Sequence, residues 1–119
     1  MSERSISLYL DDILSSIEHI EEYVKGLSFD NFKNDAKTID AVVRNIEIIG
    51  EAAAKIPPET RLHHPETPWK KIIGARNKVI HEYFGIDVEI LWKTIQEDIP
   101  LLKEKVSTIT KADPTKMTS

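Results

Sequence analysis

The sequence predicts an all-α fold with four main helices and one short helix or turn. Apolar residues recur at helical spacing in four long segments, and glycine or proline stands between these segments. No part of the sequence resembles a pair of strands. Because 119 residues suffice for one hydrophobic core and not for two, we expect a single domain over residues 1–110. The tail, 111–119, has few apolar residues and is expected to be disordered.

The composition excludes several classes of protein. It is 40% hydrophobic and 30% charged, as in an ordinary soluble globule. Without cysteine, the chain can form neither a disulfide framework nor a thiolate metal site. It has no apolar run of membrane-spanning length and no apolar signal segment, so we expect a cytoplasmic protein without membrane contact. A net charge of −4 disfavours a surface coated in nucleic acid, so RNA would have to bind a local basic patch.

The first helix is predicted over residues 6–27 by apolar residues whose spacing alternates between four and three. These residues are Ile6, Leu10, Ile13, Ile17, Ile20, Val24 and Leu27. Such a heptad pattern is typical of a long helix that packs at a shallow angle. Gly26 and Ser28 are expected to end it. The polar segment Phe29–Lys37 then predicts a loop.

The second helix is predicted from about Thr38 to Lys55, where apolar residues follow the helical period. Gly50 and the alanines at 52–54 make this helix slim, so another helix can approach it closely. Pro57 and Pro58 end the helix, because proline lacks a backbone N–H. The segment Glu59–His64 is expected to form a single turn or a short helix.

The third helix is predicted from Pro68 to about His81 or Tyr83, with Thr67 as its N-cap. Gly85 lies just past its end, where a glycine often terminates a helix.

A fourth helix is predicted to begin at Asp87 and to be kinked at Pro100, because a proline inside a helix removes one backbone hydrogen bond. Its inward-facing residues are Val88, Leu91, Trp92, Ile95, Ile99, Leu102 and Val106.

Residues capable of RNA chemistry are concentrated at the end of the predicted third helix. The stretch from residue 70 to 81 has four basic residues and no acid, and it includes Arg76 and His81. RNA carries its own nucleophile, the 2′-hydroxyl, so cleavage needs a group that moves protons and a cation that binds phosphate. His81 can be both base and acid, and Arg76 can bind phosphate through two hydrogen bonds, without a metal. Tyr83 can stack on a base or donate to a phosphate oxygen.

The geometry of one straight helix separates the two main candidates, Arg76 and His81. Five residues place their side chains roughly 140° apart around an ideal helix. Three arrangements would still bring them together: the helix frays or widens near His81, the long arginine reaches round, or two copies of the helix meet across a dimer interface. We favour the last two in combination. In a purely structural interpretation, Arg76 instead pairs with a glutamate of a neighbouring helix.

The pattern Arg76-x4-His81-x-Tyr83 resembles the motif of HepT-like toxins, which belong to the HEPN superfamily of helical ribonucleases. Segments 41–52, 64–77, 83–87 and 92–94 continue the resemblance, which covers nearly all of residues 6–106. The resemblance implies an up-and-down helical bundle that forms a homodimer, with the motif at a cleft between protomers. It also favours Asn45 or Glu51 as a residue that supports the cleft.

The resemblance further implies the toxin of a type II toxin–antitoxin system, a metal-independent endoribonuclease with tRNA as one substrate class. Arg76 and His81 would be catalytic, and Asn77, Lys78 and Tyr83 would contact the RNA substrate. The implied partner is an MntA-like nucleotidyltransferase antitoxin, which uses ATP to transfer AMP onto Tyr83. The toxin itself would need no cofactor. Adenylylation would place bulk and negative charge where substrate phosphate must bind.

Two other interpretations remain open. The chain could be a non-catalytic HEPN subunit of a nucleotidyltransferase, in which the basic stretch holds phosphate. It could also be a structural dimeric bundle, in which Arg76 and His81 point away from each other. A metal site at His63, His64 and Glu66 is disfavoured, because adjacent histidines are poorly spaced for chelation.

Overall fold

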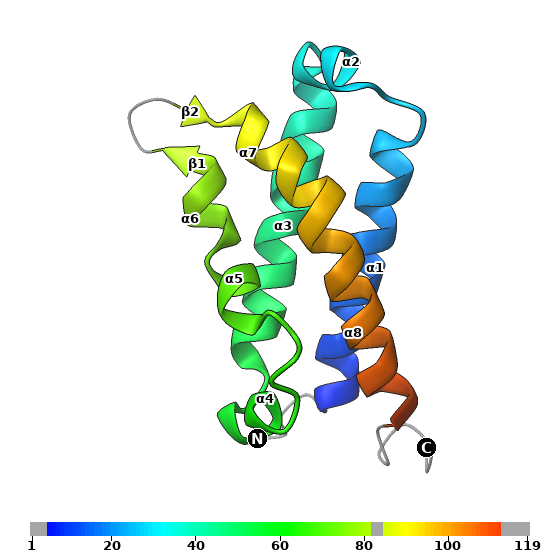
Figure 1. The fold of residues 1–119 in the computed structure, drawn as a ribbon, viewed down its shortest axis with the longest axis vertical. Coiled ribbons are helices and arrows are strands. Elements are labelled where there is room, and N and C mark those ends of the chain that lie inside the picture. The colour runs from blue at the N-terminus through cyan, green and yellow to red at the C-terminus, as the bar shows by residue number, and fades with distance from the viewer. Residues whose placement is uncertain (1–4, 82–84, 113–119) are drawn as a thin grey trace.

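The computed structural model describes residues 5–81 and 85–112, and its elements are almost all helical (Figure 1). The helices are α1 (Ile6–Val24), α2 (Phe29–Lys33), α3 (Ala36–Lys55), α4 (Pro58–Leu62), α5 (Trp69–Ile73), α6 (Ala75–Val79), α7 (Val88–Lys93), the π-helical segment η1 (Thr94–Asp98) and α8 (Ile99–Ala112). Two short strands, β1 (Ile80–His81) and β2 (Gly85–Ile86), complete the described chain. The all-α expectation is confirmed. None of the described helices combines the length and apolarity that crossing a bilayer requires.

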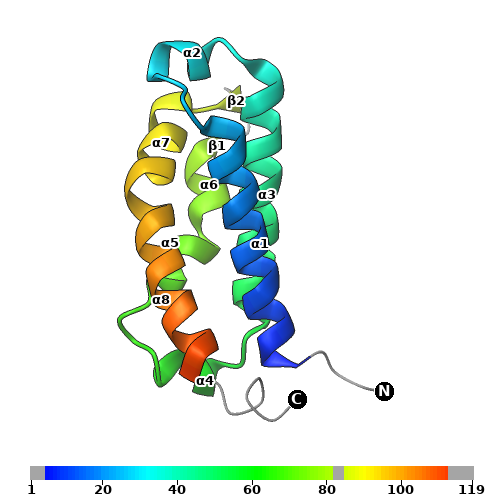
Figure 2. The ribbon, with the colours of Figure 1, turned by 90° about the vertical axis from the view of Figure 1, so that its right-hand side faces the viewer.

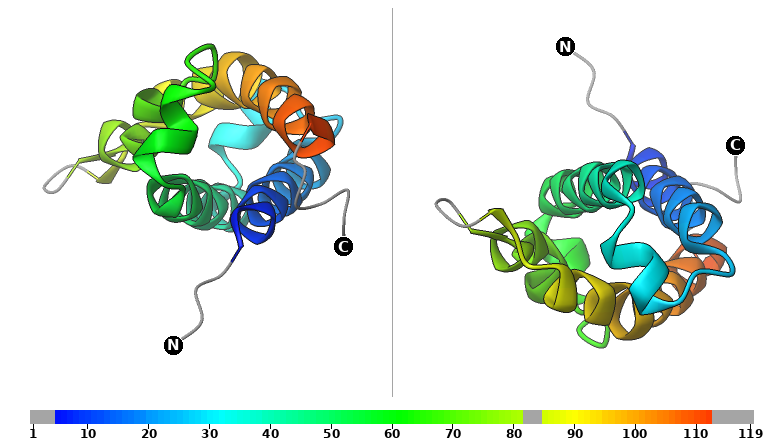
Figure 3. Two further views of the ribbon diagram at one scale, coloured as in Figure 1. Left: turned by 90° about the horizontal axis from the view of Figure 1, so that it is seen from below. Right: turned by 90° about the horizontal axis from the view of Figure 1, so that it is seen from above.

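The helices form columns that alternate in direction (Figures 1 and 2). The helix α1 and the α5–α6 column run one way, whereas α3 and the α7–η1–α8 column run the other. Seen along the long axis, these columns surround the interior, and α2 lies across one end (Figure 3). The short helix α4 confirms the expected turn or short helix after the second long helix.

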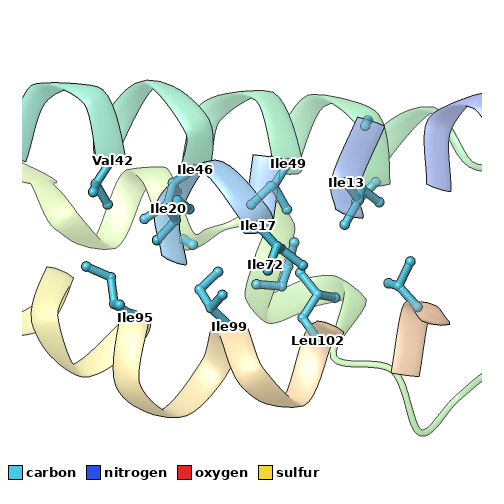
Figure 4. Close-up of a cluster of buried hydrophobic side chains, with 14 of the residues drawn as sticks. Ile13, Ile17, Ile20, Val42, Ile46, Ile49, Ile72, Ile95, Ile99 and Leu102 are labelled. Carbon is cyan, nitrogen blue, oxygen red and sulfur yellow. The ribbon is translucent and has the colours of Figure 1, made fainter. Parts of the chain in front are cut away.

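The hydrophobic core fills the space between the columns (Figure 4). The central residues of the predicted heptad pattern in α1 are buried and meet buried residues of α3, α5, η1 and α8, whereas Ile6 and Val24 at its ends are partly buried. The labelled core residues are Ile13, Ile17, Ile20, Val42, Ile46, Ile49, Ile72, Ile95, Ile99 and Leu102. The end of α1 also follows the sequence, because Gly26 adopts the left-handed φ of 77° soon after Val24.

Gly50 lies where α3 approaches α5 closely, as its small size predicted. A Cβ atom built on Gly50 would lie 3.5 Å from the carbonyl oxygens of Ile72 and Ile73. This is ordinary van der Waals contact for one methyl group, whereas a branched side chain would have to displace the α5 backbone.

Gly50→Ala is therefore expected to stabilise the protein by up to about 1 kcal/mol, because alanine favours helix without a clash. Gly50→Val should destabilise it by about 1–3 kcal/mol through overpacking. Urea unfolding of both variants measures these changes, and a Gly50→Val variant as stable as the Gly50→Ala variant would contradict the close approach.

The predicted loop over Phe29–Lys37 is wrong, because its first half forms the helix α2. Ser28 Oγ accepts a hydrogen bond from Asn31 N at 3.1 Å, and Asn31 Oδ1 accepts one from Ser28 N at 3.4 Å. This capping box uses asparagine in place of the usual Glu or Gln. Phe32 is fully buried, and its ring centre lies 5.0 Å from that of Trp92. Reciprocal capping and one buried aromatic ring thus stabilise a five-residue helix that has no visible period.

Asp35 caps α3, which begins at Ala36, two residues before the predicted start at Thr38. The Thr38 hydroxyl donates to Asp35 Oδ2 at 2.7 Å, and Thr38 N donates to Oδ1 at 3.1 Å. These two hydrogen bonds hold the pKa of Asp35 below its ordinary value, the hydroxyl contributing most.

A lowered carboxyl pKa stabilises the fold at neutral pH, and the stabilisation is lost as the pH falls through the folded-state pKa. Asp35→Ala should therefore lower the melting temperature at pH 7, and the difference from wild type should shrink below about pH 4, the ordinary range of an aspartate pKa. Circular dichroism melts at pH 7 and pH 3 test this, and a difference that is equal at both pH values would contradict it.

The predicted third helix from Pro68 to about His81 or Tyr83 is wrong in extent. It begins at Trp69, is interrupted at Gly74 and ends at Val79. Thr67 does not act as the predicted N-cap, because its side chain accepts no capping hydrogen bond in the described structure.

The prediction that no strands pair is also wrong, because β1 and β2 form a short antiparallel ladder after α6. Ile80 lies opposite Ile86, and His81 lies opposite Gly85. Asp87 N donates to Val79 O at 2.7 Å, which extends the pairing. Gly85 is not a helix terminator but belongs to β2, with a left-handed φ of 81°. The helix thus ends at Val79, and cross-strand bonds begin at the next β-branched residue, Ile80.

The fourth helix begins at Asp87 as predicted, since Asp87 Oδ1 accepts a hydrogen bond from Ile90 N at 3.0 Å. Ahead of Pro100 the helix changes to the π-helical segment η1 and then continues as α8. Thr94 Oγ1 also donates to Ile90 O at 2.9 Å at the start of this segment. The disturbance expected at Pro100 therefore takes the form of a widened turn before it.

Candidate functional site

Arg76 lies on α6 and is fixed by an acid from α3. Its Nε donates to Glu47 Oε2 at 3.0 Å, and its Nη1 lies 3.4 Å from Asn77 Oδ1. The Arg76 side chain is still 51% exposed, whereas that of Glu47 is 28% exposed. A guanidinium has five N–H donors, so both Nη2 hydrogens and one on Nη1 remain without a partner in the described chain. The site therefore presents an oriented cation with free donors toward solvent.

His81 follows α6 as part of β1 and not as part of a helix. The angle of roughly 140° that an ideal helix would impose between Arg76 and His81 does not apply, because α6 ends at Val79. Of the three arrangements considered, the structure bears on the first, in which the helix frays or widens near His81. The helix in fact ends before His81, at Val79. The His81 side chain and the whole of Tyr83 lie outside the described residues, so their convergence with Arg76 stays a prediction.

The basic stretch is partly neutralised. Lys71 Nζ lies 2.9 Å from Asp98 Oδ1, and this hydrogen bond and charge raise the pKa of Lys71. Lys70 and Lys78 are exposed and form no ion pair with another described residue. Lys78 also lines a cleft of about 240 Å³, whose other charged residues are Lys71, Lys93, Glu97 and Asp98. Lys78, two residues after Arg76 on the same helix, therefore adds a positive charge that no described acid neutralises.

The contact between Arg76 and Glu47 is the pairing with a glutamate of a neighbouring helix that the structural interpretation predicted. Asn45, one of the two favoured support residues, is buried and faces α1: its Nδ2 donates to Ala41 O at 2.9 Å, and its Oδ1 lies 3.4 Å from His19 Nδ1. Glu51, the other, lines a small hollow with Tyr9 of α1. Glu47 lies one helical turn before Gly50, where the α5–α6 column approaches α3.

The possible metal ligands do not gather in the described structure. His64 Nδ1 lies 3.9 Å from Glu66 Oε1 in the turn after α4. Within residues 5–81 and 85–112, no three histidine, aspartate or glutamate side chains are grouped so that they could hold a metal ion.

Fold and site together define a small all-α domain with an exposed, anchored arginine on a short helix. The family described as ribonuclease HepT-like matches residues 13–109. A Thermococcus cleftensis protein named "Probable ribonuclease HepT" is 49% identical, over 92% of this chain and 99% of its own length. Two proteins named "Putative RNase" are also similar. The one from Caldanaerobacter subterraneus subsp. tengcongensis is 48% identical, over 85% of this chain and 90% of its own length. The one from Methanocaldococcus jannaschii is 41% identical, over 92% and 100%.

No solved structure matches the chain significantly. The family match covers most of the sequence, and the relatives align over nearly their whole lengths. The chain belongs to the ribonuclease HepT-like family, as the motif indicated.

Proposed function

We propose that this chain is a metal-independent endoribonuclease and that tRNA is among its substrates. Ribonuclease activity agrees with the family and with the names of the relatives. The observation that carries the finer proposal is the half-exposed Arg76 guanidinium, which Glu47 orients through Nε while its outer donors stay free. A guanidinium with free parallel donors is suited to bind a phosphodiester.

In the proposed reaction, His81 removes the proton of a ribose 2′-hydroxyl, and that oxygen attacks the adjacent phosphorus. The bond from phosphorus to the 5′-oxygen breaks, and the protonated His81 returns a proton to this leaving oxygen. Arg76 stabilises the additional negative charge on the phosphate oxygens. Asn77, Lys78 and Tyr83 contact the flanking nucleotides. The products are a 2′,3′-cyclic phosphate and a 5′-hydroxyl.

The test is incubation of purified protein with labelled tRNA in the presence of EDTA. We expect cleavage to persist, with cyclic phosphate at the new 3′ ends. A synthetic RNA with a 2′-deoxyribose at the cleaved position should remain intact, because it lacks the nucleophile. Cleavage of that RNA at the modified position, or loss of all cleavage in EDTA, would refute the mechanism.

We further propose that the chain is a homodimeric cytoplasmic toxin whose partner is an MntA-like nucleotidyltransferase antitoxin. The family resemblance supports this partner, which would use ATP to transfer AMP onto Tyr83. Co-expression should therefore add whole AMP units to the intact mass of the chain, and Tyr83→Phe should abolish the addition. An unmodified mass after co-expression with an active nucleotidyltransferase would contradict the proposal.

The Arg76–Glu47 ion pair also favours a second candidate, a non-catalytic subunit of a nucleotidyltransferase. A paired arginine attracts phosphate less strongly than a free one. This candidate predicts a stable complex with the enzyme and no cleavage of RNA. Growth arrest on expression, relieved by changing Arg76 or His81, would favour the nuclease.

A further inference from the structure

A pocket lies where α4 meets α5, at the opposite end of the bundle from α2 (Figure 1). Its volume is about 650 Å³, within the usual range for sites that bind small organic molecules. Its walls are mainly apolar and include Leu62, Trp69 and Ile73. Leu62 is 76% exposed, which is unusual for a large apolar side chain in this protein. The walls therefore suit a flat, apolar-faced ligand.

Two unsatisfied polar atoms lie in the wall of this pocket. Thr67 is only 2% exposed, and its hydroxyl has no hydrogen-bond partner among the described residues. The Nε atom of Arg61, which also lines the pocket, likewise has no hydrogen-bond partner among the described residues. Buried polar groups are seldom left without partners, so two in one wall indicate a ligand that has hydrogen-bonding groups at its edge.

The charge of the pocket fits a phosphorylated ligand. Arg61 and Lys70 line it, and no acidic residue does. Lys70 is also the first residue of the basic stretch that contains Arg76. Ile73, which lines the pocket, is the last residue of α5, and Arg76 lies three residues further on in α6. The pocket and Arg76 therefore lie on consecutive short helices of one column.

We propose that the pocket between α4 and α5 binds one unstacked nucleobase of the RNA substrate, close to the scissile linkage. This inference rests on the proposed ribonuclease function and adds a site of sequence selection to it. The base would lie against Leu62 and Ile73 and use its edge to hydrogen-bond Thr67, while Arg61 and Lys70 bind the adjoining phosphates.

The test follows the indole N–H signals of Trp69 and Trp92 by ¹⁵N NMR during titration with AMP, GMP, CMP and UMP. Trp69 lines the pocket and donates to His64 O at 3.0 Å, whereas Trp92 packs against Phe32 at the other end of the bundle. We expect at least one nucleotide to shift the Trp69 signal saturably and to leave Trp92 unchanged. Ribose 5-phosphate, which has the phosphate without the base, should have no such effect.

Thr67→Val should weaken the binding of that nucleotide by about 3- to 10-fold, the effect of one hydrogen bond. Thr110→Val is the matched control, because it removes another unpartnered hydroxyl that lies outside the pocket. Failure of all four nucleotides to shift Trp69, or an equal shift with ribose 5-phosphate, would overturn the base pocket.

Cleavage assays separate this inference from the proposed function. Thr67→Val is expected to raise KM for RNA and to leave kcat unchanged, because the base pocket contributes binding and no chemistry. A Thr67→Val variant that cleaves RNA with the KM of the wild type would refute the base pocket and leave the nuclease proposal standing. A wild-type protein that binds nucleotides at Trp69 but cuts no RNA would refute the nuclease and retain the pocket.

Discussion

His81→Ala is expected to slow RNA cleavage by roughly 100- to 10,000-fold, the usual contribution of one general acid–base group. Both proton transfers of the proposed reaction pass through this imidazole, so the variant loses the base and the acid together. The other three histidines are placed elsewhere, His19 on α1 and the remaining two in the turn after α4. The sequence thus offers no second imidazole next to α6 to replace it.

Single-turnover cleavage of labelled tRNA measures the effect of His81→Ala, and a circular dichroism melt checks the fold. The pairing of β1 with β2 uses backbone atoms, so alanine at position 81 can keep this pairing. His63→Ala, at an exposed position, is the matched control and should cleave as wild type does. A His81→Ala variant that cuts RNA at the wild-type rate would end the catalytic assignment.

Periodicity predicted the long helices well because their apolar residues repeat over several turns. Leu10, Ile13, Ile17 and Ile20 of the heptad pattern in α1 are buried, and so are Leu91, Ile95 and Leu102 of the last column. The end of α6 could not be predicted in the same way. Val79 and Ile80 continue a helical pattern, but hydrogen bonds to a segment six to eight residues further on convert Ile80 into a strand. Such bonds depend on the return of the chain and leave no period in the sequence.

The candidate site was only partly accessible to sequence reasoning, for a related reason. The motif identified Arg76 from chemistry and spacing, but the acid that anchors it depends on which face of α3 meets α6. Asn45, Glu47 and Glu51 all lie within two turns of one helix. Their helical angles differ, and in the structure Glu47 meets the arginine whereas Asn45 meets His19 of α1. Contacts between columns therefore require the structure.

Arg76→Ala is expected to lower the cleavage rate by about 100- to 1,000-fold, the usual cost of removing one donor that stabilises charge in a transition state. Arg76→Lys should restore little, because an ammonium can neither keep the bond from Nε to Glu47 nor offer two parallel donors. Lys103→Ala is a matched control, since Lys103 forms a comparable exposed ion pair with Glu21 at 2.9 Å. Equal losses in the Arg76 and Lys103 variants would indicate a general electrostatic effect and not a phosphate clamp.

Glu47→Gln then distinguishes whether the acid orients Arg76 or masks it. Glutamine keeps a carbonyl oxygen that can accept from Nε, so a purely orienting role predicts nearly normal cleavage for Glu47→Gln and a large loss for Glu47→Ala. If Glu47 mainly neutralises the arginine, both variants should bind RNA more tightly than wild type, because each releases the positive charge. Filter-binding and single-turnover rates for the two variants measure both quantities. Tighter binding without faster cleavage in both variants would favour the non-catalytic subunit over the nuclease.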